Sequence, residues 1–280
     1  MFNSQLSETF VAHPKGGIHA LSLNQGYDET CLLVHGFLGQ GYWWHWLIPY
    51  LSQKYNVIVL DLPGMGQSAD RVSYSLSDMG EAINHVITQL GNKQPLHLIG
   101  HSFGALSSAH AILQNHKHFK TFHCVDMDLI HLQNEVRPTA SMLPRRCFNS
   151  ESELTNRFRL VPAATSCADE WIKFLAEKSI TKFNEGWAWS FDPNVLNVQK
   201  NNILANFQSL CQSNTMPAQL ILGKDTNVLN IEQASKHWAS MFNQTNIEVM
   251  SGYHHLMLDD PKKLFELIDT FIEGTHGSTK

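Results

Sequence analysis

A serine held between two glycines is the first place in this chain where chemistry could occur. Residues 100–104 read GHSFG, which fits the pattern G-x-S-x-G between an apolar run and a helical pattern. A tight turn from strand to helix leaves little room for side chains, and Gly100 and Gly104 provide that room. The turn would lift the Ser102 hydroxyl above the sheet, beside the free N–H groups of the helix start. Ser102 is therefore a candidate nucleophile, and a plain glycine-rich turn is the alternative.

A second glycine-containing loop could stabilise negative charge. Residues 35–39, HGFLG, follow an earlier apolar run. The backbone N–H of Phe37, together with that of Phe103, could bind the oxyanion that forms when a hydroxyl attacks a carbonyl group. Taken alone, the same residues could be a simple connection.

The order of these motifs resembles the α/β-hydrolase family. The loop at 35–39, the turn DLPGMGQS at 61–68, the serine motif at 100–104 and a late histidine follow one another, and the resemblance covers residues 9–130 and 215–273. It implies a serine hydrolase without a metal or organic cofactor. The turn at 61–68 is expected to be structural. A serine nucleophile argues against epoxide and haloalkane hydrolysis, which use a carboxylate in this family.

The same resemblance selects a general base from 16 histidines. In relatives the catalytic histidine lies on the loop between the last strand and the last helix, seven residues before a proline. Pro261 begins the predicted last helix, and seven residues before it stands His254. His255 is the neighbouring alternative.

The acidic partner of the histidine departs from the common family pattern. Relatives usually carry it three residues after the glycine that ends a late strand, and Thr226 occupies that place after Gly223. Asp225 stands one residue earlier. A less common arrangement places the acid after the strand that follows the nucleophile helix, where Asp126 stands. We prefer Asp126 and keep Asp225 as the alternative acid.

The elements that must position these residues alternate along the chain. Short apolar runs predict strands at residues 31–34, 57–60, 96–99, 122–126, 220–222 and 247–250, and residues 9–13 and 18–23 predict an edge hairpin. Apolar residues at helical spacing predict helices near 79–90 and from Pro261 onwards. We therefore expect an α/β fold, a mainly parallel central sheet flanked by helices.

The stretch at residues 134–213 interrupts this alternation. It is rich in arginine, asparagine and aromatic residues, and it predicts a mostly helical cap inserted into a core of residues 1–133 and 214–280. Six of the seven tryptophans stand after the loop at 35–39 or in this cap. We expect Trp43, Trp44 and Trp187 to line an apolar substrate pocket, although core packing is the alternative for each of them.

Composition excludes several classes of protein. The net charge is −5 and the 20 lysines and arginines are scattered, so nucleic acid is not an expected partner. No apolar run is long enough for a membrane span. The five cysteines have no metal-ligand spacing, so we expect no metal site. Free thiols and the lack of a signal segment predict a cytoplasmic protein. The oligomeric state stays open.

These observations predict an enzyme that acts on a small-molecule substrate. We expect a carboxylesterase-like serine hydrolase that cleaves an ester or related acyl bond of a largely apolar substrate through an acyl-enzyme. The same residues could also serve a thioesterase or a carbon–carbon bond hydrolase. A small-molecule receptor without turnover is the alternative outside enzymes.

Overall fold

An eight-stranded sheet forms the centre of this computed structural model, which describes residues 6–90, 94–136, 142–183, 185–213, 216–242 and 246–276. The strands are β1 (Ser7–Val11), β2 (Ile18–Leu23), β3 (Thr30–Val34), β4 (Asn56–Leu60), β5 (Leu96–His101), β6 (Phe119–Val125), β9 (Ala218–Gly223) and β10 (Asn246–Met250). Their spatial order is β1-β2-β4-β3-β5-β6-β9-β10, and all pairs from β4 to β10 are parallel. The loops after these parallel strands therefore open at one edge of the sheet.

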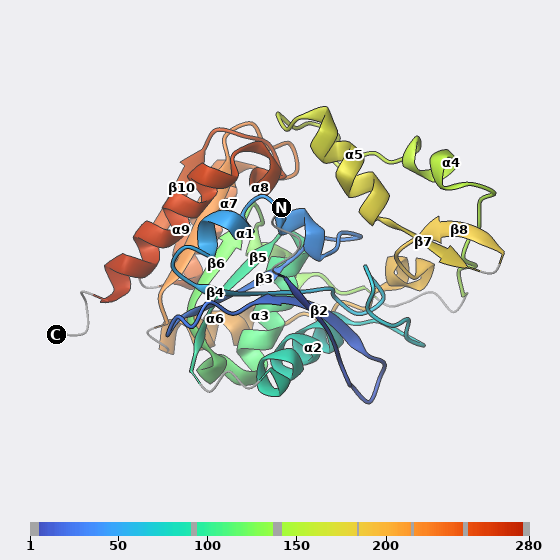
Figure 1. Ribbon diagram of the computed structural model, residues 1–280. Helices are drawn as coiled ribbons and strands as arrows, with labels where there is room; N and C mark the ends of the chain where they lie inside the picture. The colour runs from blue at the N-terminus through green and yellow to red at the C-terminus, as the bar shows by residue number, and fades with distance from the viewer. Residues whose placement is uncertain are drawn as a thin grey trace.

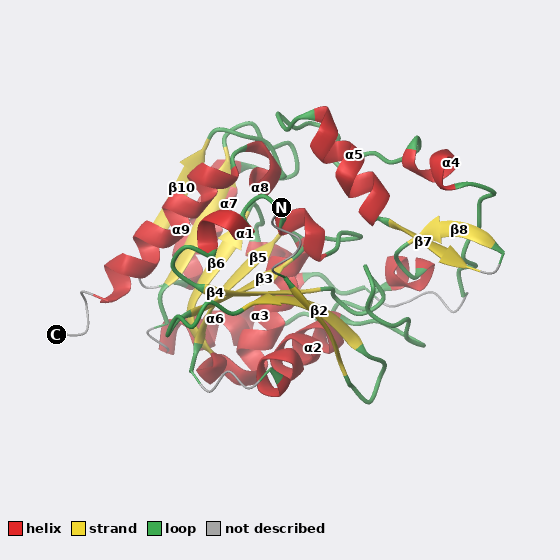
Figure 2. Cartoon of the chain, in the orientation of Figure 1, coloured by secondary structure: helices red, strands yellow, loops and turns green. Residues whose placement is uncertain are grey.

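Helices cover both faces of the sheet (Figures 1 and 2). One face carries α2 (Leu76–Gln89), α3 (Phe103–Asn115), α6 (Leu204–Ser213) and α7 (Ile231–Met241); the other carries α1 (Ile48–Leu51), α8 (Leu256–Asp259) and α9 (Pro261–His276). Neighbouring strand residues divide between the two cores, with Leu32 in one buried cluster and Leu33 in the other. Because strand side chains alternate in direction, an unbroken apolar run is what a strand buried on both faces requires.

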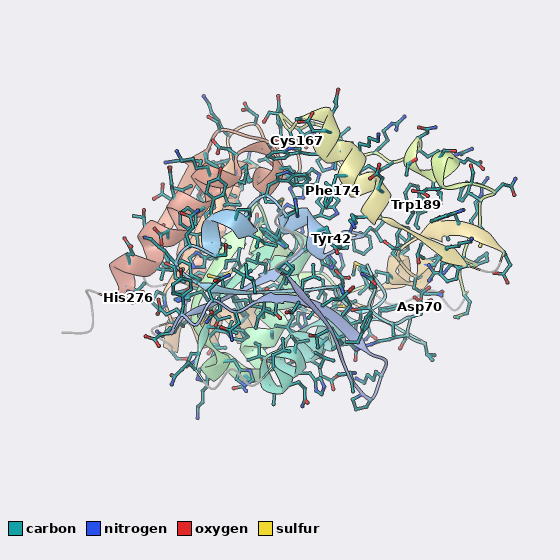
Figure 3. The ribbon with its side chains drawn as sticks, in the orientation of Figure 1. Tyr42, Asp70, Cys167, Phe174, Trp189 and His276 are labelled. Atoms are coloured by element: carbon teal, nitrogen blue, oxygen red, sulfur yellow. The ribbon has the colours of Figure 1, made fainter. Side chains whose placement is uncertain are left out.

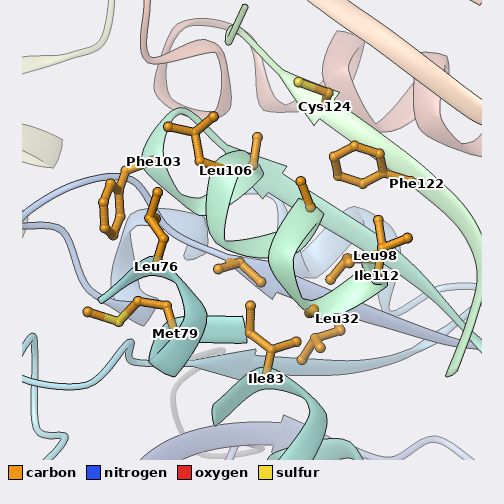
Figure 4. Packing of buried hydrophobic residues seen from close by; sticks show 14 of the residues in the cluster. Leu32, Leu76, Met79, Ile83, Leu98, Phe103, Leu106, Ile112, Phe122 and Cys124 are labelled. Atoms are coloured by element: carbon orange, nitrogen blue, oxygen red, sulfur yellow. The ribbon is translucent and has the colours of Figure 1, made fainter. Parts of the chain in front are cut away.

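The core beneath the serine motif is formed by α2, α3 and the sheet. Figure 4 shows Met79 and Ile83 of α2 in the same buried cluster as Leu106 of α3. Helix α2 begins where the Ser75 hydroxyl accepts a hydrogen bond of 3.0 Å from the backbone N–H of Asp78. This packing fixes α3 on the sheet and with it the start of the helix.

The predicted fold class is confirmed by these elements. Each apolar run forms a strand, the N-terminal hairpin lies at one edge of the sheet, and α9 begins at Pro261. Within the described residues, no helix is both long and apolar enough to span a membrane.

The chain between β6 and β9 is more mixed than the helical cap expected from the sequence. It contains α4 (Glu151–Thr155), α5 (Asp169–Lys178) and an antiparallel hairpin of β7 (Ile180–Phe183) and β8 (Gly186–Trp189), which lie together beside the core in Figure 1. Aromatic and β-branched residues in the hairpin favour strands. Helix α6 belongs to the main core instead, since its Phe207 shares a buried cluster with Trp238 of α7. The division at residues 134 and 213 stays a prediction.

Short 3-10 helices complete the connections of the described chain. They are η2 (Gly41–Trp44), η3 (His116–His118), η4 (Leu129–Gln133) and η5 (Pro193–Asn197). Of these, η2 follows the loop at residues 35–39, and η5 follows β8. Leu196 of η5 lines the hollow described below.

We predict that His110→Leu weakens the acid sensitivity of the fold. His110 lies buried in α3, and burial lowers its pKa from 6.5 to about 4. Between these two pH values the unfolded chain binds a proton that the folded chain does not, so stability falls as the pH drops, by up to about 1.4 kcal/mol per pH unit. Urea unfolding over this range should give a smaller slope of unfolding free energy against pH in the variant. Above this range the difference between the two proteins should be constant; equal slopes throughout would contradict the assignment.

Candidate active site

Ser102 stands in the sharp turn between β5 and α3. Its backbone adopts φ of 52° and ψ of −121°, a left-handed conformation that is unusual for a residue with a side chain. A Cβ atom at Gly104 would overlap the carbonyl oxygens of Val34 and His35, and one at Gly100 would press on Ala105 and Ser108. The two glycines therefore let the helix start close against β3, and the partly exposed Ser102 side chain lies at the top of the turn.

His254 lies between a hydroxyl and a carboxylate. Its Nε2 is 3.0 Å from Ser102 Oγ, and its Nδ1 is 2.7 Å from Asp126 Oδ2. A carboxylate only accepts, so the Nδ1–H donates to Asp126 and Nε2 is left to accept the Ser102 hydroxyl proton. The structure thus brings together Ser102, His254 and Asp126, which are far apart in the chain.

Asp126 is held in place from three sides. It follows β6 with φ of 47°, and its side chain is 0% exposed. Besides His254, its carboxylate accepts hydrogen bonds from the backbone N–H of Gly223 at 2.9 Å and from the Thr226 hydroxyl at 2.7 Å. The hydrogen bond from the Thr226 hydroxyl was not predicted from the sequence. There, Thr226 stood out only as the residue at the usual position of the acid.

The alternative acid, Asp225, lies elsewhere. Its side chain is exposed, while its backbone N–H donates to the Gly252 carbonyl at 2.9 Å. Within the described residues, Asp225 makes no hydrogen bond or ion pair to His254. The geometry therefore favours Asp126 as the partner of the histidine.

The two expected oxyanion donors lie beside the serine. Phe103 is the first residue of α3, where N–H groups have no partner inside the helix. The loop that carries Phe37 passes close by, since a Cβ at Gly36 would come within 3.4 Å of Ser102 Cβ. The rings of Phe37 and Phe103 are 5.1 Å apart between centroids. Their backbone N–H groups make no hydrogen bond to a protein acceptor within the described chain, and their role stays a prediction.

Three buried imidazoles meet at the site. The ring centroids of His101 and His254 are 4.6 Å apart, and those of His254 and His255 are 5.0 Å apart. Burial, with a smaller contribution from His254, lowers the pKa of His255 to about 3 and the pKa of His101 well below its usual range. His101 and His255 are therefore neutral near pH 7, so neither places a second positive charge beside His254 when His254 is protonated.

Among the described residues, these three histidines are the group whose nitrogen atoms are near enough to one another to bind a metal ion together. One nitrogen from each of His101, His254 and His255 lies within 4.8 Å of the others. His254 contacts Ser102 and Asp126 through its two nitrogens, and His101 Nε2 is 2.9 Å from the His254 carbonyl oxygen. The group is thus already used for hydrogen bonding, and the expectation of no metal stays a prediction.

A hollow of about 340 Å³ opens beside Ser102. Its walls come from separate parts of the chain and are mostly apolar: Phe37, Ser102, Phe103, Leu106, Met127, Val136, Leu196, Val198 and Lys200. Apart from Phe37, Ser102 and Phe103, these residues were not singled out from the sequence. They come from several segments and follow no common periodicity, so no local pattern identifies them.

The three tryptophans expected in the pocket do not line this hollow. Trp43 and Trp44 are buried in the core on the α9 face, and their rings pack near His255 and His101. Trp187 lies in β8, where its backbone pairs with Phe148. Both indoles of η2 are thus turned into the core, where they pack against the two histidines. A place for the three tryptophans in a substrate pocket stays a prediction.

A carboxylate on α8 ties the histidine loop to the chain ahead of α5. Asp259 Oδ2 accepts a hydrogen bond of 2.7 Å from the backbone N–H of Tyr253, the neighbour of His254. Its Oδ1 accepts bonds of 2.7 Å from the Thr165 hydroxyl and from the backbone N–H of Ser166. One side chain thus connects the position of His254 to the inserted segment.

Aromatic rings make a second connection between α5 and the core. Figure 3 labels Tyr42 of η2 and Phe174 of α5, whose rings meet edge to face with centroids 6.0 Å apart. Beside them, Trp46 and Trp171 stack with centroids 4.2 Å apart. Trp46 and Trp171 therefore fasten α5 to the core.

Comparison with known proteins places the chain in a fold family. The family model of the alpha/beta hydrolase fold matches residues 30–261. The chain is 36% identical over 88 residues to the uncharacterized hydrolase YugF of Bacillus subtilis, which is 31% of this chain and 32% of that protein. It is 33% identical over 92 residues to the pimeloyl-[acyl-carrier protein] methyl ester esterase of Aeromonas hydrophila, 32% of this chain and 34% of the relative. The matches thus span about a third of the length of these relatives.

A solved structure matches over nearly the whole chain. The thioesterase domain from the curacin biosynthetic pathway has a TM-score of 0.79 and 25% sequence identity, over 94% of this chain and 99% of that domain. The overall fold is therefore shared with this thioesterase domain.

We predict that Asp259→Ala loosens the histidine loop and the segment before α5 together. Loss of hydrogen bonds to a charged acceptor should lower the unfolding free energy by about 2–3 kcal/mol in urea titrations. Hydrogen exchange should accelerate at the backbone amides of Tyr253 and Ser166. As a control, Asp260→Ala removes only the bond from the Lys263 N–H at the start of α9 and should affect that amide alone. Independent responses of Tyr253 and Ser166 would contradict the connection.

Proposed function

Because the chain belongs to the α/β-hydrolase fold family, we propose that it is a serine hydrolase that cleaves an ester bond of a small, largely apolar substrate. The observation that carries the proposal is the continuous chain of hydrogen bonds from Ser102 through His254 to Asp126, at 3.0 and 2.7 Å. A nucleophile bonded to a base that is oriented by an acid is the arrangement required for acyl transfer.

The reaction follows from the positions of these groups. Ser102 Oγ attacks the ester carbonyl carbon while His254 Nε2 takes the hydroxyl proton. The negative oxygen of the tetrahedral intermediate is bound by the backbone N–H groups of Phe37 and Phe103. His254 then gives its proton to the leaving alcohol, which leaves an acyl group on Ser102. Water, activated by His254, hydrolyses this acyl-enzyme and restores the serine.

Asp126 orients His254 for proton transfer. Asp126 accepts the Nδ1–H, which fixes the tautomer and stabilises the imidazolium. The Gly223 N–H and the Thr226 hydroxyl hold this carboxylate in position. The neutral His101 and His255 add no repulsion. The positive charge that forms on His254 is therefore stabilised by the negative charge of Asp126.

Thioester hydrolysis is the second candidate. The similarity to a solved thioesterase domain extends over 94% of the chain at 25% identity. The same chain of hydrogen bonds serves either substrate, and also carbon–carbon bond hydrolysis. A receptor without turnover would not require a nucleophile poised against a base, so we place it last.

We also propose that the protein works in a reducing compartment, since all five cysteines are free.

We predict that a fluorophosphonate probe labels the protein and that Ser102→Ala abolishes this labelling. The same substitution should lower hydrolysis of p-nitrophenyl esters about a million-fold, because no other hydroxyl contacts His254 in the described residues. Matched oxygen esters and thioesters of one acyl chain would separate the two candidate activities. A folded wild-type protein that neither reacts with the probe nor cleaves an ester would instead favour a receptor.

We predict that Asp126→Asn lowers kcat about ten-thousand-fold, because an amide can hold the imidazole in the wrong tautomer. Asp225→Asn is the matched control and should change kcat by less than about twofold, since this side chain is exposed and makes no hydrogen bond to His254 within the described residues. Both variants should be compared at one pH with the same ester. Loss of activity in Asp225→Asn alone would reverse the assignment.

A further inference from the structure

Among the residues that the structure describes, one charged group lines the hollow beside Ser102. Seven of the nine described lining residues are apolar, and the other two are Ser102 and Lys200. Lys200 is partly buried, and within the described chain it has no ion pair and no side-chain hydrogen bond. An ammonium group in mostly apolar surroundings is less well solvated than one on an open surface. An anion placed beside it there would be attracted more strongly than in bulk water.

The backbone fixes the position of this lysine. Lys200 N–H donates to the Val136 carbonyl at 3.0 Å, and Val136 N–H donates to the Lys200 carbonyl at 2.9 Å. Two residues earlier, Val198 is buried and also lines the hollow. The root of the Lys200 side chain is therefore anchored on the wall of the hollow that holds the nucleophile.

The size of the hollow limits the ligand. A volume of about 340 Å³ holds roughly ten water-sized groups at about 30 Å³ each. A short aliphatic chain fits this space, with one end at Ser102 and the other near Lys200. The apolar walls suit the methylene groups between the two ends.

We infer that the substrate is an ester with a carboxylate at the end remote from the scissile bond, and that Lys200 selects it. Half-esters of straight-chain dicarboxylic acids belong to this chemical class. The inference rests on the proposed function, because it names the substrate class of the same site. Lys200 acts as a specificity determinant and takes no part in bond cleavage.

The kinetic test compares charged and neutral esters of equal length. Monomethyl esters of dicarboxylic acids, from succinate to azelate, are paired with methyl esters of the matching monocarboxylic acids, and kcat/KM is measured for each pair. We expect the ratio of charged to neutral kcat/KM to exceed one at one chain length and to fall about tenfold in Lys200→Met. Lys200→Arg, which keeps the charge, should retain most of the ratio.

A matched control separates this effect from general electrostatics. Lys236 lies exposed on α7 and pairs with Glu232, so Lys236→Met removes the same charge away from the hollow. It should leave the ratio unchanged. A second series of esters carries the carboxylate on the alcohol part instead of the acyl part. If kcat/KM depends on Lys200 in only one series, the part of the ester that carries the carboxylate in that series is the part that enters the hollow. A wild-type ratio at or below one in both series, or an equal fall in Lys236→Met, overturns the inference.

Binding provides a test that does not depend on turnover. In Ser102→Ala protein, calorimetry should show tighter binding of a half-ester than of its neutral counterpart, and adding Lys200→Met should remove most of the difference. If no ester is cleaved but this difference is found, the proposed function fails and the anion site stands. If esters are cleaved through Ser102 without any dependence on Lys200 in either assay, the inference fails and the proposed function stands.

Discussion

The close approach of α3 to β3 is the constraint on which the candidate site depends. Gly104 lies against the carbonyl oxygens of Val34 and His35, with no room for a side chain. Because the helix starts this close to the sheet, the chain must turn sharply at Ser102. The backbone N–H of Ser102 still bonds to the Val125 carbonyl of β6 at 3.0 Å. One steric contact therefore fixes Ser102 beside β6, the strand that leads into Asp126.

Asp126 then joins the ends of several strands. Its carboxylate accepts from Gly223 at the end of β9, from Thr226 beyond it, and from His254 on the loop after β10. The three bonds come from three different residues, and together they satisfy a carboxylate that is fully buried. The acid thus orients the histidine and also holds the loop after β9, which in relatives usually carries the acid itself. In this chain Thr226 takes that place and supports the relocated carboxylate.

The sheet and the serine turn could be predicted because their signals are local. Apolar runs, helical spacing and a glycine on each side of Ser102 are properties of a few neighbouring residues. The choice between Asp126 and Asp225 could not be made in this way, since both follow strands that end at the same edge and only the backbone of the fold directs their side chains. The tryptophans show the same limit. Their residue type indicates burial, but only the packed structure shows that Trp43 and Trp44 lie beneath the histidines and not in the hollow.

Three residues with side chains adopt left-handed backbone conformations in the described chain: Leu38, Ser102 and Asp126, with φ of 57°, 52° and 47°. All three lie in the loops that form the site, and each such conformation costs on the order of 1 kcal/mol or more. Glycine would adopt the same angles without that cost. At Ser102 and Asp126, heat resistance and the proposed turnover are therefore opposing demands, and selection for thermostable variants would favour glycine at two of the groups on which the proposed chemistry depends.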